Sequence, residues 1–398
     1  MAIEIRCPTA DEWPAVCRVD ARAFGAYYTE EDIEIRRPLH DLSRFRVAFD
    51  GSAVASVAAS YALDVTLPGG ASVPMGGTTW VSTAATHRRR GLMRQVVTAV
   101  HRDIDERGEP LATLTASEGG IYEHLGYGIA TRLRVTTIEP RLTSIRSEFR
   151  LSDPGVRYVD DGDDVVDAIG PIWERFRRCR VGEVSRSDVW HQVIYDIRSR
   201  PEDGHGPVEY LVHRDGFAAY AMRENWNDGH PAHTMDLIEL AAVTPEAHLA
   251  LWQTVLGVDL VGRINARCIP IDDPLPFLLD NQRALRTTDC NDGVWVNVLD
   301  PSISFGARTY RSTDRIVIEV DGVRWAIEGG PDGGSCKKVR STPDLVASHP
   351  AFSSLLYGGV LPSALVAGRR MTARNQGVLD RADVFFTTSL APHCQTGY

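Results

Sequence analysis

The stretch that decides the fold is "THRRRGLMR", residues 86–94, in which three consecutive arginines lead into a glycine and then an apolar pattern. It follows a predicted strand, "GGTTWVST", and opens a predicted helix that stops at Gly108. The helix carries apolar residues at four-residue spacing, namely Leu92, Val96, Val100 and Ile104. A strand, loop and helix in this order direct unpaired backbone N–H groups and the positive end of the helix dipole at one point.

The residue types in this loop suit a diphosphate. Gly91 has no Cβ, so phosphate oxygens can approach the backbone donors closely. The neighbouring arginines add charge-assisted hydrogen bonds. Position alone favours a plainer interpretation, a solvated basic turn at a helix start, because cations are disfavoured there only mildly.

The charge of the whole chain has the opposite sign to the loop. The 398 residues carry a formal net charge of −10, from 43 basic and 53 acidic residues. This balance argues against a nucleic-acid partner and favours a cationic small substrate. The length predicts two or three domains.

The cysteines and the N-terminus indicate a reducing compartment. Seven cysteines are scattered without a CxxC pair, so we expect neither a disulfide framework nor a metal site, and we expect a cytoplasmic protein. "MAIEIRCPTADEW" lacks the apolar run of a signal peptide. The uncharged stretch 351–368 contains Gly358, Gly359 and Pro362, which predicts two short buried elements joined by a turn and no membrane insertion.

The chain divides into three units, at 1–150, 151–289 and 290–398. The first two share an order of strand, helix, hairpin, strand, loop and helix, which indicates an internal repeat. In the second copy, residues 244–247 ("TPEA") stand where the arginines stood, so we expect the shape without the charge. The third unit begins with a hairpin about Asp321-Gly322 and ends in a predicted strand at 382–388.

Several motifs carry a resemblance to the GNAT (GCN5-related N-acetyltransferase) superfamily. Residues 88–93 resemble its RxxGxG/A pyrophosphate loop, with Met93 in place of the last small residue, and "IYEHLGYG" resembles its "FYxxxGF" segment. "ATHRRRGLMR", "ASEGGIY" and the degenerate second copy narrow the resemblance to the Eis (enhanced intracellular survival) family.

This resemblance implies an α/β (α+β) chain of two tandem GNAT-like mixed-sheet domains followed by a sterol-carrier-like domain. It also implies an acetyl-CoA-dependent enzyme that acetylates several amines of aminoglycosides, assembled as a homohexamer. Two other functions stay open: acetylation of protein lysine side chains, and lipid binding by the third unit on a non-catalytic GNAT scaffold.

The resemblance assigns the catalytic roles. Tyr122 becomes the general acid, because a phenol of pKa ~10 can protonate a thiolate whose acid has a pKa of ~8.5. Tyr127 is its competitor, and the base is the terminal carboxylate of Tyr398, which otherwise reads as a frayed end. The implied cofactor contacts are Val81, Ser82, Thr83, Arg89, Arg90, Gly91, Leu92, Met93, Arg94, Ser117 and Glu118.

The substrate pocket matches the family less well. Relatives have acidic residues where this chain has Ala26 and Gly397. We therefore expect the pocket to use the nearby acidic residues Glu30, Glu31 and Asp32, and Trp80 to be either a pocket wall or a core residue.

Overall fold

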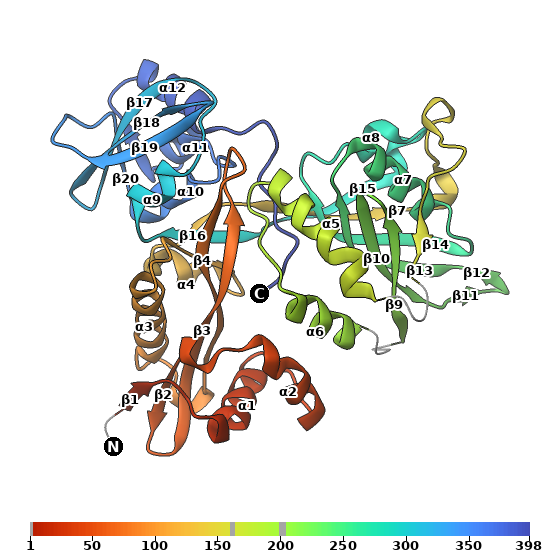
Figure 1. Ribbon diagram of the computed structural model, residues 1–398, viewed down its shortest axis with the longest axis horizontal. Helices are drawn as coiled ribbons and strands as arrows, with labels where there is room; N and C mark the ends of the chain where they lie inside the picture. The colour runs from red at the N-terminus through yellow and green to blue at the C-terminus, as the bar shows by residue number, and fades with distance from the viewer. Residues whose placement is uncertain (1–2, 160–163, 199–203) are drawn as a thin grey trace. The chain divides into compact units, whose positions relative to one another are not determined.

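The computed structural model (Figure 1) describes residues 3–159, 164–198 and 204–398, which form two compact units. The first unit combines the chain up to residue 131 with residues 293–392 and 396–398. The second unit comprises residues 132–292 and 393–395. Both are mixtures of helices and mixed β-sheets, as predicted.

A seven-stranded sheet with helices on both faces forms the N-terminal part of the first unit. In spatial order its strands are β1 (Ile3–Arg6), β2 (Phe45–Asp50), β3 (Ala53–Thr66), β4 (Ser72–Thr83), β5 (Leu111–Thr115), β16 (Val294–Val298) and β6 (Gly128–Ile129). Its helices are α1 (Trp13–Ala23), α2 (Glu30–Arg36), α3 (Leu92–Glu106) and α4 (Gly119–Tyr122).

The alternation of side chains along β2 explains why α1 and α3 lie on opposite faces of this sheet. Val47 and Phe49 pack in the apolar cluster that contains α1, whereas Ala48 packs in the cluster that contains α3. The predicted stripe of α3 is buried against the sheet, with Val96, Val100 and Ile104 fully covered.

The C-terminal part of the first unit is a smaller sheet with its own helices. Its strands are β19 (Gly333–Lys338), β18 (Val323–Gly330), β17 (Asp314–Val320), β20 (Leu345–Ala347) and β21 (Met371–Ala373). Its helices are α9 (Pro301–Gly306), α10 (His349–Ser354), α11 (Pro362–Ala367) and α12 (Gln376–Phe386). The two short elements predicted within 351–368 correspond to α10, which is buried as predicted, and α11, of which Pro362 alone is buried.

Two predicted strands are corrected by the structure. The last predicted strand, at 382–388, is the end of α12, whose buried residues Val378, Leu379, Ala382, Phe385 and Phe386 recur at helical spacing over a longer window. The sequence "IATRLRVTTI", residues 129–138, predicts a single strand, which the structure divides. Its first residue belongs to β6 of the first sheet, and residues 132–138 form β7 of the second sheet.

The second unit is built on another seven-stranded sheet. Its strands are β15 (Leu285–Asp292), β7 (Arg132–Ile138), β14 (Val261–Pro270), β13 (His233–Ala242), β10 (Gly216–Arg223), β9 (His205–His213) and β8 (Arg157–Tyr158), beside a small hairpin of β11 (Trp226–Asn227) and β12 (His230–Pro231). Its helices are α5 (Val165–Cys179), α6 (Asp188–Arg198), α7 (Pro245–Leu256) and α8 (Leu275–Leu278). Within the described ranges, no helix is both long and apolar enough to cross a bilayer.

A buried ion cluster stabilises the second unit. Glu239 on β13 is 4% exposed and pairs with Arg186 at 3.1 Å and Arg198 at 2.9 Å. Burial by itself raises the pKa of Glu239, but the two arginines outweigh it and lower the pKa to about 2. The carboxylate therefore favours the folded state above its unfolded pKa near 4.5, and this contribution is lost as the pH falls toward 2.

Replacing Glu239 by glutamine should destabilise the protein by about 3–5 kcal/mol at pH 7, because Arg186 and Arg198 lose their buried counter-charge. Urea titrations at pH 7 and pH 3 measure this, and the difference from wild type should shrink at the lower pH. Glu328→Gln, which removes an exposed pair with Arg315, is the control and should cost less than about 1 kcal/mol. Equal effects of the two substitutions would contradict the assignment.

Candidate active site

The site lies where two parallel strands of the first sheet separate. β4 and β5 pair only at Gly76–Ala112 and Gly77–Thr113 among the residues described. A Cβ on Gly76 would lie 2.3 Å from the Ile104 side chain of α3, so only glycine lets this helix pack so closely on the strand. Beyond Gly77, β4 continues to Thr83 with β3 alone as its partner.

A bulge in β4 sets the orientation of its last residues. Val57 of β3 pairs with Ser82 and Ala59 pairs with Thr79, so β4 has one more residue than β3 over this span. Trp80 sits in the bulge with φ of +54°, a conformation that few non-glycine residues adopt. Val81, Ser82 and Thr83, after the bulge, line a cavity.

The arginine loop has the open helix start that an anion site needs. Gly91 is the N-cap of α3 with φ of +73°, and no side chain caps this helix. A Cβ on Gly91 would approach only the Gln95 amide, at 3.9 Å, so the backbone conformation rather than crowding by the protein requires glycine here. In the second copy, by contrast, the Thr244 side chain accepts a hydrogen bond from the Ala247 N–H and caps α7.

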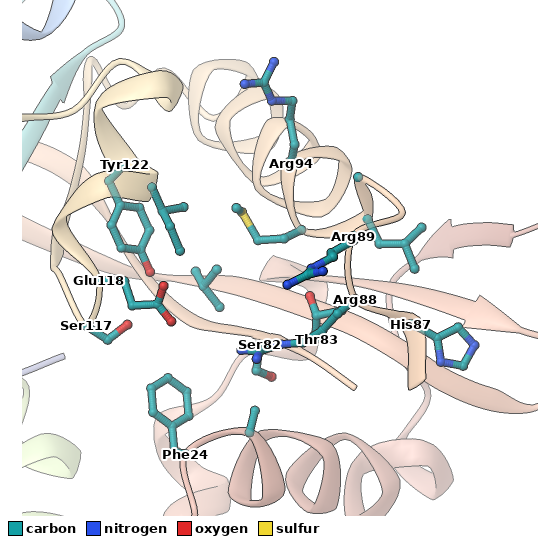
Figure 2. Close-up of a pocket in the computed structure, with 16 residues that line it drawn as sticks. Phe24, Ser82, Thr83, His87, Arg88, Arg89, Arg94, Ser117, Glu118 and Tyr122 are labelled. Carbon is teal, nitrogen blue, oxygen red and sulfur yellow. The ribbon is translucent and has the colours of Figure 1, made fainter. Parts of the chain in front are cut away.

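The cavity has a volume of about 520 Å³ and brings most of the predicted cofactor residues together (Figure 2). Figure 2 shows Ser117, Glu118 and Tyr122 along one side of it, with Arg88 and Arg89 of the loop reaching in from another. The predicted residues that line it are Val81, Ser82, Thr83, Arg89, Gly91, Leu92, Met93, Arg94, Ser117, Glu118 and Tyr122.

Several predicted site residues lie outside the lining. Arg90 points to Asp50, 3.7 Å away, and Trp80 packs against Trp13 and His40 with ring centroids 5.1 and 4.9 Å apart. In α2, Asp32 forms a capping box with Thr29. Glu30 and Glu31 are exposed on the same helix and are not lining residues.

The lining also contains five residues outside the predicted set of cofactor contacts: Ala23, Phe24, His87, Arg88 and Ile121. Phe24 directly follows α1 and is 55% exposed, which is unusual for so large an apolar ring. In the sequence, the position of this bulky aromatic residue between a predicted helix and Gly25 could have indicated that Phe24 belongs to the site.

The two candidate tyrosines have different surroundings. Tyr122 lines the cavity, and burial raises the pKa of its phenol while a hydrogen bond with Ser117 lowers it. Tyr127 is fully buried, with its hydroxyl 2.8 Å from Thr78 Oγ1 and 2.7 Å from His101 Nε2. Only Tyr122 presents its phenol to the cavity.

The last residue packs on the separated strands. The Tyr398 ring covers Gly77, where a Cβ would lie 3.1 Å from it, and the phenol oxygen is 2.8 Å from Thr113 Oγ1. A terminal oxygen of Tyr398 accepts a hydrogen bond from Thr115 Oγ1 at 3.1 Å. Thr115 ends β5, two residues before Ser117 of the cavity wall.

Known proteins share this architecture. Residues 4–130 and 182–296 each match an acetyltransferase (GNAT) domain family. The chain is 32% identical to N-acetyltransferase Eis of Mycobacterium tuberculosis, over 98% of each chain. The chain belongs to the Eis family. It is also 32% identical to an uncharacterized N-acetyltransferase of Streptomyces avermitilis over the full length of both.

Solved structures of the same fold extend this result. The crystal structure of Eis1 from Mycobacterium abscessus matches with a TM-score of 0.87 at 28% identity, over 99% of this chain and all of the other. A GCN5-related N-acetyltransferase from Anabaena variabilis matches over the full length of both chains with a TM-score of 0.83 at 15% identity, which shows the fold alone. This Eis-family chain is therefore an N-acetyltransferase, and GNAT acetyltransferases use acetyl-CoA as the acetyl donor.

The cavity fits that donor. The uncapped start of α3 and the Arg88 and Arg89 side chains suit the diphosphate, and the strand after the β4 bulge suits an extended chain with amide groups. The loop therefore gives Arg89 and Arg90 different expected roles, since only Arg89 lines the cavity.

Arg89→Ala should weaken acetyl-CoA binding by about 1.5–3 kcal/mol, the range for a lost hydrogen bond to a charged group. Arg90→Ala, the matched control, should have a much smaller effect because its side chain faces Asp50. Isothermal titration calorimetry of both variants with acetyl-CoA gives the comparison. A larger loss for Arg90→Ala would show that the loop binds phosphate in another conformation.

Proposed function

We propose that this Eis-family chain transfers acetyl groups from acetyl-CoA to primary amines of cationic small molecules, aminoglycosides in particular, at more than one position. One observation carries the proposal: a single cavity joins the arginine–glycine loop to the Tyr122 phenol. The acidic net charge and the family of the chain support a cationic acceptor.

The lining residues of the cavity and the Tyr398 carboxylate, which is not one of them, divide the chemistry among them. Acetyl-CoA supplies the acetyl group as a thioester, and the amine nitrogen forms the new C–N bond as the C–S bond breaks. Backbone N–H groups of Val81–Thr83 polarise the thioester carbonyl. Tyr122 donates its proton to the departing sulfur, and the Tyr398 carboxylate accepts the proton that the amine loses.

The environment of Tyr122 suits a general acid. Burial raises the pKa of its phenol, so the group stays protonated at neutral pH and has a proton to donate. The hydrogen bond with Ser117 partly offsets that rise. It therefore brings the pKa of the phenol closer to the pKa of the thiol that forms when the thiolate is protonated. Tyr127, whose hydroxyl already contacts Thr78 and His101, supports the site from behind through its ring contact with Tyr122, at 6.0 Å between centroids.

The Eis family supports three further proposals. We propose that the C-terminal part of the chain is a sterol-carrier-like domain, that the chain assembles as a homohexamer, and that it acts in the cytoplasm.

The test of the function is mass-detected acetylation of kanamycin by wild type and Tyr122→Phe. Wild type should add more than one acetyl group, and the variant should lose about 10²- to 10⁴-fold in kcat with acetyl-CoA affinity retained, as for loss of a general acid. Tyr127→Phe is the matched control and should retain the chemical step. Turnover of a lysine peptide but not of kanamycin would instead assign protein acetylation, and no acetyl-CoA binding would assign a non-catalytic scaffold.

A short neutral peptide added after Tyr398 should lower turnover sharply while acetyl-CoA still binds, because it converts the terminal carboxylate into an amide. Tyr398→Phe is the control. It keeps the carboxylate and the ring, loses the hydrogen bond with Thr113, and should stay active. Full activity of the extended protein in a steady-state assay would show that the base lies elsewhere.

A further inference from the structure

Two buried polar atoms face each other beside the cavity without the partners that buried atoms normally have. Asp20 of α1 is 6% exposed and Ser82 of β4 is 5% exposed. Asp20 Oδ1 and Ser82 Oγ have no hydrogen-bond partner in the part of the chain that the structure describes. The Ser82 hydroxyl is near enough to the Asp20 carboxyl to lower its pKa as a weak hydrogen-bond donor, but the pair is too long for an ordinary hydrogen bond. Buried polar atoms left in this state are rare, because burial removes their water.

The Asp20 carboxylate also has no cation beside it. No ion pair joins it to a lysine or arginine of the described residues, and the arginines of this region have other contacts. Arg36 lies over the Tyr28 ring at 5.2 Å and pairs with Asp32 at 3.5 Å, and Arg37 donates to the His40 carbonyl at 2.6 Å. Burial raises the pKa of Asp20 and Ser82 offsets part of that rise, with a net pKa of about 6, so the carboxylate is the larger form at pH 7.

The pair lies next to the wall of the cavity. Ser82 lines it directly, and Asp20 is one helical turn before Ala23 and Phe24, which also line it. The charge of Asp20 acts on the phenols of Tyr28 and Tyr61, whose pKa values burial raises and Asp20 raises further. A negative charge among aromatic rings attracts an organic cation.

We propose that Asp20 and Ser82 form a subsite that binds an ammonium group of the acceptor, one other than the amine that is acetylated. The ammonium donates hydrogen bonds to Asp20 Oδ1 and Ser82 Oγ, and its charge pairs with the carboxylate. The subsite makes the enzyme prefer polyamines over monoamines. This inference rests on the proposed acetylation of small amines.

The experiment compares Asp20→Asn with wild type on kanamycin and on a matched probe pair, the diamine cadaverine and the monoamine pentylamine. The variant should raise KM for kanamycin and cadaverine about 10- to 100-fold, as for a lost charged hydrogen bond, and leave KM for pentylamine and the acetyl-CoA affinity unchanged. Its melting temperature should not fall, because the substitution removes an unpaired buried charge. Glu30→Gln, an exposed change of the same charge, should alter none of these values.

Three outcomes decide the matter. An unchanged KM for the diamine in a folded variant, or equal changes for diamine and monoamine, would overturn the subsite. If Asp20→Asn does not fold, Ser82→Ala serves instead and should raise the KM for the diamine more than the KM for the monoamine. Calorimetric binding of kanamycin to wild type and variant in the presence of coenzyme A separates this inference from the proposed function, because a difference in binding persists even if no amine is acetylated.

Discussion

The short ladder between β4 and β5 is the constraint on which the catalytic part of the chain depends. Its two glycines leave both faces of the strand open to close contact, since consecutive residues point to opposite sides of a sheet. On one side, Gly76 lets Ile104, in the last turn of α3, approach the strand and so holds the helix that begins at the arginine loop against the sheet. On the other, Gly77 lies under the Tyr398 ring. A side chain at either position would displace one half of the machinery.

The buried charged side chains of this protein differ in whether other residues of the chain supply their partners. Glu239 is balanced by two arginines, and the fully buried Arg308 donates to the carbonyls of Leu355, Leu356 and Phe386. Both arrangements are complete within the chain and need nothing further. Asp20 is buried to a similar extent, yet one oxygen has no partner among the described residues. Glu183 also has one buried oxygen without a partner among these residues, so what sets Asp20 apart is its place beside Ser82 of the cavity wall.

Much of the site followed from the sequence because its signals are local. The arginine–glycine loop, the helix after it and the short helix that carries Tyr122 each span fewer than about twenty consecutive residues. Over that length, helix capping and helical periodicity can be recognised in the sequence. The failures are long-range. β16 enters the first sheet from residue 294, and β7 pairs with β14 and β15, choices that strand patterns do not encode. Likewise, the side on which Arg90 lies depends on Asp50, forty residues earlier in the chain.

The terminal residue shows how a weak local signal can be overruled by packing. Chain ends fray unless contacts hold them, and nothing in "APHCQTGY" requires order. In the structure, Gln395 donates its backbone N–H to the buried Glu183 of the second unit, and Tyr398 bonds Thr113 and Thr115 of the first. Each anchor is a polar contact to a residue far away in sequence. A carboxylate placed at the end of β5 therefore depends on every element that positions those anchors, which is why only the family resemblance, and no local pattern, pointed to it.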